Sequence, residues 1–446
     1  MAKTKISEWS STPGSNTDID GINIAENCPP SGINDAIREM MSQVKDLYSG
    51  TTGDAIAVAG GGTGATTASA ARTALGVAIG TDVQAYDAKL STLAGASANR
   101  ATFLASDQGF GFRNRIINGD MRIDQRNNGA SVTPATATYL LDRWVFNFTQ
   151  ASKFSFQQNA GSVTPPVGFT HYLGATVVSA VSVGAGDVFV LRQKIEGVNV
   201  SDLGWGTANA QTVTLSFWVR SSLTGTFGAA FQNSAENRAY PFTYSISAAN
   251  TWEQKTITVA GDTTGTWVTN GGTGIQLSFS LGTGTTSSGT AGVWASANYA
   301  SATGAVSVVG TNGATFYSTG VQLEAGSVAS PFERRDYGRE FDMCRRYYER
   351  FKNVGFYATG GAMYANQPRF CVTYYPKRTT PSFDFSAAST FIVQGNGTNQ
   401  TPSGFSVAGQ DINNTYFYPT GTTLAVGLSA ALGNGTTSYL AFSAEL

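Results

Sequence analysis

Charge is scarce in this 446-residue chain, since Asp, Glu, Lys and Arg make up 13% of it, about half of the ~25% that is usual in soluble proteins. The net charge is -1, which argues against nucleic-acid phosphates as partners. No apolar run reaches the ~18 residues of a membrane helix, and the initial MAKTKISEWS lacks the apolar core of a secretion signal. We therefore expect no nucleic-acid partner, no membrane insertion, and folding in a cytoplasm.

Residue types that carry catalysis or bind metals are also rare. The one histidine, His171, stands in the turn-rich stretch GFTHYLGA, and neither a G-x-S-x-G motif nor a catalytic-cysteine motif occurs. Three cysteines, Cys28, Cys344 and Cys371, lack metal-ligand spacing and suggest reduced, structural thiols. The expectation is a protein without metal, cofactor or catalytic residues.

Paired carboxylates leave one enzymatic possibility, because glycoside hydrolysis needs only two acids facing each other across a sugar. Asp120 and Asp124 are four residues apart in NGDMRIDQRNNG, where four nearby arginines favour ion pairing. Asp142, beside Arg143 and Trp144 in LLDRW, suggests a buried salt-bridge corner. A polysaccharide depolymerase therefore stays open as an alternative function.

Glycine, in contrast, is abundant at 52 residues, and residues 60–67 read GGGTGATT. A phosphate-binding loop would end in Gly-Lys-Ser/Thr, but the first basic residue after Gly64 is Arg72, and Thr67 stands where the dinucleotide motif needs Gly or Ala. We interpret the run as a joint between a helical stem and a β-rich body. Glycine accepts a positive φ and a close backbone approach at such a joint.

Residues 31–48 predict the helix of that stem, with Ser31 as N-cap and Gly50 at its C-terminus. Its apolar residues step by 4, 3, 4 and 3, the a/d rhythm of a coiled-coil stem: Ile33, Ile37, Met40, Val44 and Leu47. Two heptads also suit an ordinary amphipathic helix. Two shorter helices are expected at 68–75 and 82–94.

From residue 107 on, the apolar period changes to that of β-strands. Apolar and polar residues alternate over 213–219 and 275–281, and further short apolar runs lie between Gly, Ser, Thr and Asn clusters. The fold class is therefore mainly β, with a jelly-roll β-sandwich over 107–335.

The segment 333–352 is different, because 12 of its 20 residues are charged. Its less polar positions repeat the helical 4, 3, 4, 3 rhythm: Tyr337, Phe341, Cys344, Tyr348 and Phe351. Pairs of Asp342 with Arg346 and of Arg345 with Glu349 would support this helix. It either docks on a sheet or forms an aromatic seam between chains, and a small second β domain is expected over 353–446.

Exposed aromatic faces among amides and hydroxyls suit sugar binding, because an apolar ring face stacks while its edge hydroxyls form hydrogen bonds. Candidates in loop-like settings are Trp267, Trp294, Tyr416 and Tyr418. Each of them also suits ordinary packing, and Trp218 in its alternating strand is a weaker candidate.

Three separate segments resemble bacteriophage tail-fibre proteins. WSSTPGSNTDIDGINIAENCPPSGINDAIREMMSQVKDLY resembles a virion-attachment region, and GGTGATTASAARTALG with VQAYDAKLSTLAG is similar to fibre linker repeats. The body resembles the carbohydrate-binding-module-like sandwich of phage fibres in RNRIINGDMRIDQRNNGA, LLDRW, LRQKIEGVNVSDLGWG, VTLSFWVRSSLTGTF and GVQLEAGSVASPFERRDYGREFDMCRRYYERF. Residues 353–446 match least.

The resemblance implies a non-enzymatic homotrimer on the virion tail, assembled in the host cytoplasm. Its N-terminal end would bind phage tail proteins, and its distal end would bind host cell-surface polysaccharide. Four parts follow: a virion-attachment segment (1–50), a linker (51–106), the sandwich (107–335), and a connecting helix with a distal β domain (336–446). A depolymerase and a purely structural spacer remain alternatives.

Overall fold

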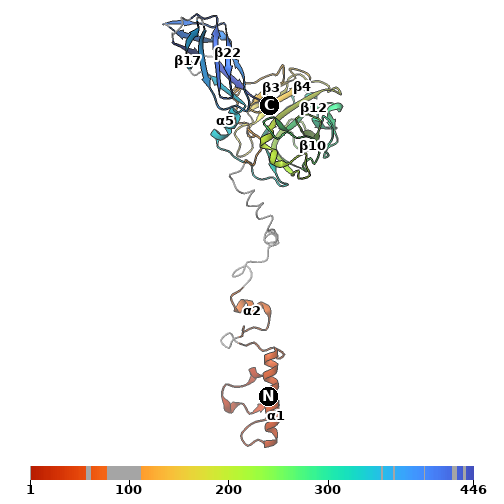
Figure 1. Ribbon diagram of the computed structural model, residues 1–446. Coiled ribbons are helices and arrows are strands. Elements are labelled where there is room, and N and C mark those ends of the chain that lie inside the picture. The colour runs from red at the N-terminus through yellow and green to blue at the C-terminus, as the bar shows by residue number, and fades with distance from the viewer. Residues whose placement is uncertain are drawn as a thin grey trace. The chain divides into compact units, whose positions relative to one another are not determined.

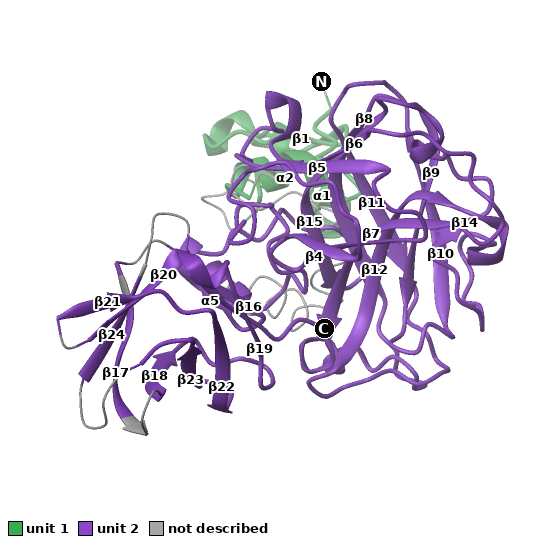
Figure 2. Cartoon of the chain, turned by 90° about the horizontal axis from the view of Figure 1, so that it is seen from above, with its two compact units in different colours: residues 1–109 green, residues 110–446 purple. Residues whose placement is uncertain are grey.

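The computed structural model describes residues 2–56, 62–77, 112–352, 355–364, 367–395, 397–423, 429–434 and 438–446. The chain divides into two compact units, residues 1–109 and 110–446 (Figure 2). Antiparallel strands dominate the second unit (Figure 1), so the mainly β prediction is confirmed. Within the described ranges, no helix has the length and apolar character needed to cross a membrane.

Unit 1 contains the predicted stem helix, α1 (Pro30–Ser49). Gly50 ends it as predicted, with a left-handed φ of 73° and an amide that bonds back into the last turn. The predicted N-cap is wrong, because Ser31 lies inside the helix. Pro30 occupies the first turn instead, where its missing N–H costs no hydrogen bond.

One side of α1 is covered by residues from the start of the same chain. Gln43, 2% exposed, accepts a hydrogen bond from the Trp9 indole (3.0 Å) and donates one to the Lys3 carbonyl (2.9 Å). A small ribbon of β1 (Asp18–Ile19) and β2 (Ile22–Asn23) also contacts the helix.

Another side of α1 carries the predicted stem residues, and the described residues of unit 1 leave that side open. Four of the five are 41–49% exposed, and Leu47 is half-buried: Ile33, Ile37, Met40 and Val44 are the exposed ones. Met41 and Tyr48, one position beyond two of them, are also exposed. An apolar face of this width is unusual on a 20-residue surface helix, whose apolar residues normally face a core.

Helix α2 (Ala68–Ala74), in the expected linker, matches the helix expected at 68–75. The Thr67 hydroxyl caps it by accepting the Ala70 amide at 3.2 Å. Gly64 has a φ of 67°, and a Cβ on Gly62 would lie 2.2 Å from the Ile56 carbonyl oxygen. Both features agree with a glycine joint, whereas the helix expected at 82–94 lies outside the described residues.

Unit 2 begins with two antiparallel sheets. The six-stranded sheet has the order β10-β9-β12-β7-β4-β3, with β3 (Thr138–Leu141), β4 (Trp144–Phe148), β7 (Val188–Glu196), β9 (Gly225–Gln232), β10 (Ala239–Ile246) and β12 (Thr273–Thr283). The five-stranded sheet has the order β11-β8-β15-β6-β5, with β5 (Phe154–Gln158), β6 (Leu173–Val177), β8 (Val213–Ser221), β11 (Glu253–Val259) and β15 (Thr315–Ala325).

These two sheets share one hydrophobic core, which is the predicted sandwich. Phe217 of β8 and Phe279 of β12 meet at a centroid distance of 5.0 Å and an angle of 66°. Both strands were predicted by their alternation, but their polar residues are buried as well. Ser278, for example, is 0% exposed, because Arg192 of the neighbouring strand β7 covers it and donates to its hydroxyl (2.8 Å).

The end of the chain builds two further sheets around a second core. The seven-stranded sheet β21-β20-β24-β17-β18-β23-β22 contains β17 (Phe356–Tyr364), β18 (Gln367–Thr373), β20 (Phe391–Gly395), β21 (Thr398–Gln400), β22 (Gly404–Gln410), β23 (Asn414–Thr420) and β24 (Ser429–Asn434). The three-stranded sheet β16-β25-β19 contains β16 (Tyr348–Lys352), β19 (Ser382–Phe385) and β25 (Tyr439–Ser443). The β character expected for 353–446 is confirmed. A short parallel pair, β13 (Ser288–Gly289) and β14 (Ser301–Ala302), lies in the preceding part.

The helix expected over 333–352 is only partly correct. Helix α5 ends at Arg345 (Tyr337–Arg345), and Tyr348 and Phe351 belong to strand β16. Pairing of β16 with the distant β25 overrides the local helical rhythm. Cys344 and Tyr347 are fully buried against this unit's own residues, which agrees with a docked helix.

The ion pairs expected around α5 are also partly correct. Arg345 pairs with Glu349 at 2.7 Å, as predicted. Asp342, however, pairs with Arg345 at 3.1 Å. Arg346 pairs with the buried Glu196 of β7 at 2.7 Å, so α5 is bonded to the sandwich.

The corner at residues 142–144 forms, but its predicted salt bridge is wrong. Asp142 and Arg143 make the turn between β3 and β4, where Arg143 has a φ of 72° and the two side chains take different partners. Asp142 accepts the Gln125 amide (2.8 Å) and side chain (2.6 Å), while Arg143 pairs with Glu445. Burial raises the pKa of Asp142 to about 7.

We predict that Asp142 makes stability decrease as the pH rises from about 4 to about 7. The folded chain keeps the proton until the pH approaches 7, whereas the unfolded chain loses it near the ordinary pKa, so folding is favoured on the acidic side. Urea unfolding of Asp142→Asn, which cannot ionise, is expected to show a flatter pH dependence than the wild type. An identical pH dependence in both proteins would contradict the role of Asp142.

Candidate functional site

Three tryptophans meet at loops of the sandwich, and two of them are the predicted Trp267 and Trp294. Their centroids lie 5.5 Å apart, and Trp205 completes the group at 4.8 Å from Trp267 and 5.3 Å from Trp294. All three contacts are edge-to-face. We call these three residues the tryptophan cluster.

The cluster is anchored on one side and open on the other. Trp205 is 6% exposed, and its indole donates to the Gln211 carbonyl (2.9 Å), whereas Trp267 and Trp294 are half-buried. Gly206, with a φ of 86°, lets the loops approach, since a Cβ there would lie 2.8 Å from the Gly265 carbonyl oxygen. Two indoles therefore keep part of their surface available above a fixed base.

A charged pair supports the two half-buried indoles. Arg238 donates to both carboxylate oxygens of Asp262 (2.8 and 2.5 Å), and Trp267 donates to the same carboxylate (3.2 Å). The Arg238 guanidinium lies 6.0 Å from the Trp294 ring centroid. Burial by itself raises the pKa of Asp262, but the bonds from Arg238 and Thr264 and the charge of Arg238 together outweigh it, so the pKa lies below its ordinary value. The carboxylate is thus held as an ion beside the rings.

Exposed hydroxyl and amide side chains lie within four residues of Trp267 or Trp294 in the sequence: Thr263, Thr264, Thr266, Ser296 and Asn298. Aromatic faces combined with such groups can hold a sugar ring by stacking and hydrogen bonding. The sequence around Trp267 and Trp294 already indicated this combination of aromatic, hydroxyl and amide side chains. Trp205 was not predicted as a site residue, because its local sequence GWG gives no indication that it contacts Trp267 and Trp294.

Tyr416 and Tyr418 lie elsewhere, on β23 of the seven-stranded sheet. The residues between and beside them, Thr415 and Phe417, are buried, so both tyrosines belong to the other, outer face of the strand. Tyr416 is 47% exposed. A hydrogen bond with Cys371, its partner on β18, raises the pKa of Tyr416.

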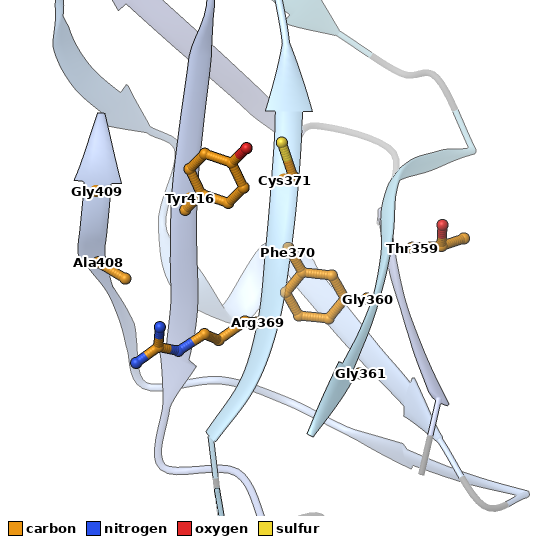
Figure 3. Close-up of a pocket in the computed structure, with 9 residues that line it drawn as sticks. All are labelled: Thr359, Gly360, Gly361, Arg369, Phe370, Cys371, Ala408, Gly409 and Tyr416. Atoms are coloured by element: carbon orange, nitrogen blue, oxygen red, sulfur yellow. The ribbon is translucent and has the colours of Figure 1, made fainter. Parts of the chain in front are cut away.

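A shallow hollow of about 530 Å³ lies beside Tyr416, across β17, β18, β23 and β22 (Figure 3). It is lined by Thr359, Gly360, Gly361, Arg369, Phe370, Cys371, Ala408, Gly409 and Tyr416. The structure does not bring this hollow and the tryptophan cluster into one site, because they belong to different sheets and separate cores.

The carboxylates considered for hydrolysis have structural partners. Asp120 pairs with Arg122, as expected, but Asp124 does not form the expected ion pair. Its oxygens accept the backbone amides of Asn127 (2.8 Å) and Gly129 (2.7 Å), which closes a turn.

The sulfur and imidazole groups are spread over the chain. All three cysteines are free thiols, and burial raises the pKa of the Cys344 thiol. His171 contacts the Thr170 hydroxyl (2.8 Å), and burial lowers the pKa of this histidine. In the described part of the chain, no three His, Cys, Asp or Glu residues gather as metal ligands would.

Comparisons with known proteins give structural similarities only. No protein-family model and no curated protein matches the chain. Similar solved structures include the enzymatically active domain of tailspike protein 4 of bacteriophage CBA120, at 13% identity and a TM-score of 0.27 over 50% of this chain and 23% of that one. Another is the module TmCBM61 in complex with beta-1,4-galactotriose, at 10% identity and a TM-score of 0.25 over 48% and 99%. A third is the family 11 carbohydrate-binding module of a Clostridium thermocellum cellulase, at 11% and 0.22 over 46% and 99%. The match spans less than a quarter of the tailspike domain, and none of these similarities establishes a family.

Proposed function

We propose that the chain is a subunit of a phage tail fibre that binds host-surface glycan through the tryptophan cluster. The observation that carries this proposal is the convergence of Trp267 and Trp294, from separate loops, into one half-exposed aromatic surface. The core indole of Trp144, in contrast, is fully buried (0% exposed). Neighbouring hydroxyls and amides supply the polar partners that a sugar edge needs.

The sequence resemblance to phage fibres supports the biological setting. The virion-attachment segment, the glycine-rich linker and the sandwich follow one another in the order of that family. In this setting the N-terminal unit would hold the fibre on the tail, and unit 2 would meet the cell surface.

The exposed apolar face of α1 supports assembly into a homotrimer. Ile33, Ile37, Met40 and Val44 form a seam that the described residues of unit 1 leave open. Each is 41–49% exposed, so burying the rest of its side chain would stabilise an assembly by about 1 kcal/mol. Three copies in one fibre also bind a repetitive polysaccharide more tightly than one copy, through effective concentration.

The glycan proposal predicts that Trp267→Ala and Trp294→Ala each weaken polysaccharide binding at least about tenfold, as loss of an aromatic anchor typically does. Binding of the purified chain to surface polysaccharide from a susceptible strain would be measured by calorimetry. Trp252→Ala is the matched control, because Trp252 is also half-buried but packs on Tyr172, away from the cluster.

Circular dichroism and melting temperature would show that all three variants stay folded. Equal loss of binding in the Trp252 control would point to general destabilisation instead of a sugar site. Unchanged binding in both cluster variants would remove the cluster from the proposal.

A further inference from the structure

We propose that the hollow beside Tyr416 is a second sugar subsite, and that it binds an acidic sugar through the ring of Tyr416 and the guanidinium of Arg369 (Figure 3). This inference rests on the proposed glycan-binding function and adds a ligand class, a pyranose that carries a carboxylate. Its volume of about 530 Å³ lies within the ~300–1,000 Å³ of small-molecule sites.

The shape of the hollow comes from residues without side chains. Gly360 is required for packing, since a Cβ there would lie 1.8 Å from the Arg369 carbonyl oxygen. Gly409 is different: its φ is not positive, and a Cβ there would meet nothing within 4 Å. Neither packing nor backbone conformation requires glycine at 409, and the effect of its missing side chain is to keep the hollow open.

A register shift between Val407 and Gly409 adds to this shape. The pairing of β22 with β23 skips Ala408, as in a β-bulge, and bulges bend a strand locally. Gly409 is thereby set opposite Tyr416, whose other neighbour is Cys371. The exposed ring of Tyr416 thus lies beside a surface without a side chain, at Gly409, and a sugar ring placed there can stack on the tyrosine ring.

The charge of the hollow is supplied by Arg369. Residues 353–446 contain two other basic residues, and neither lines the hollow: Lys377 bonds to Glu349 (2.8 Å), and Arg378 bonds to backbone oxygens, including that of Ala444 (2.7 Å). A guanidinium fork matches the geometry of a carboxylate, which favours an acidic sugar over a neutral one.

One acidic residue also acts on this end of the sheet. The charge of Asp411 contributes to the raised pKa of Tyr416. Its carboxylate is held in the β22–β23 turn, where it accepts the amides of Asn413 and Asn414 (2.7 Å each). Arg369, unlike Asp411, lines the hollow itself.

The test uses acidic tetrasaccharides of galacturonate, glucuronate and mannuronate, each beside its neutral methyl ester, titrated calorimetrically into the full-length protein. At least one acid is expected to bind about tenfold or more tightly than its ester, because a charge-assisted hydrogen bond is lost in the ester. That preference should shrink at high salt.

Variants locate the effect. Arg369→Gln is expected to bring acid and ester to equal affinity, and Gly409→Val to weaken both at least tenfold by filling the hollow. Asn399→Val is the matched control on an exposed position of β21 in the same sheet, and its binding should equal that of the wild type. Ligand should also slow alkylation of Cys371 by iodoacetamide.

Equal affinity for every acid and its ester, or binding of none of them, would overturn this inference. Acid binding that Gly409→Val and Arg369→Gln leave unchanged would overturn it as well. Its failure would be distinct from failure of the proposed function, because loss of host polysaccharide binding in Trp267→Ala and Trp294→Ala is measured separately.

Discussion

Replacing Ile37 and Val44 together by aspartate is expected to separate the proposed trimer into monomers. Both residues lie on the open apolar face of α1, with exposed fractions of 45% and 49%. Six carboxylates brought to one seam of three helices would have to be removed from water without partners, and the cost of each is several kcal/mol. Separate monomers keep these six carboxylates in water, so we expect the variant not to assemble.

Light scattering on the full-length protein would measure this change. Three chains of 46.7 kDa give about 140 kDa, and the variant is expected near 46.7 kDa. Ser42→Asp combined with Ser49→Asp is the matched control, because both serines are exposed positions outside the seam. A wild-type monomer would contradict the trimer, and a double variant that stays trimeric would remove α1 as its basis.

The second large effect is expected at Glu445, which joins the sandwich to the end of the chain. Its carboxylate pairs with Arg126 (2.8 Å) and with Arg143, which is only 1% exposed and lies 3.6 Å from the Tyr347 ring centroid. In Glu445→Gln the Arg143 charge stays buried without a counter-charge. Breaking a buried pair in this way costs about 3–5 kcal/mol.

Urea unfolding at constant pH would measure the loss in the free energy of unfolding. Asp342→Asn is the matched control, because Asp342 also pairs with an arginine but its side chain is 46% exposed. Exposed pairs contribute about 0–1 kcal/mol. A loss below about 1 kcal/mol in Glu445→Gln would show that the Arg143 charge finds another partner.

Local patterns of the chain predicted most of the architecture. Alternation around Phe217 and Phe279 predicted two strands of the sandwich core, because successive side chains of a strand point to opposite faces and so give a period of two. Gly50 marked the end of α1 because few other residues accept a left-handed φ. These features depend on neighbouring residues, so the sequence alone reveals them.

Features that depend on distant partners were missed. Tyr348 and Phe351 fit a helical rhythm, but β25, about 90 residues further on, pairs with them as a strand. The partner of Arg143 is Glu445, 302 residues away, and Asp142 next to it takes Gln125 instead. Nothing in the local sequence specifies such pairings.

The candidate site shows the same division. Composition indicated Trp267 and Trp294 as aromatic residues in polar loops, but only the folded chain shows that they meet each other and Trp205. Tyr416 and Tyr418 were predicted for the same purpose, yet they lie on a different sheet, where Tyr416 lines a hollow that glycines help to form. The glycines that shape this hollow could not be recognised from the sequence, because the chain contains 52 glycines.

Competition for phage adsorption tests the central claim, glycan recognition by this chain, most directly. Susceptible cells would be saturated with the purified full-length protein before phage is added. We predict that wild-type protein blocks adsorption and that protein carrying Trp267→Ala and Trp294→Ala does not. Undiminished adsorption at saturating wild-type protein would contradict the claim and favour a purely structural fibre.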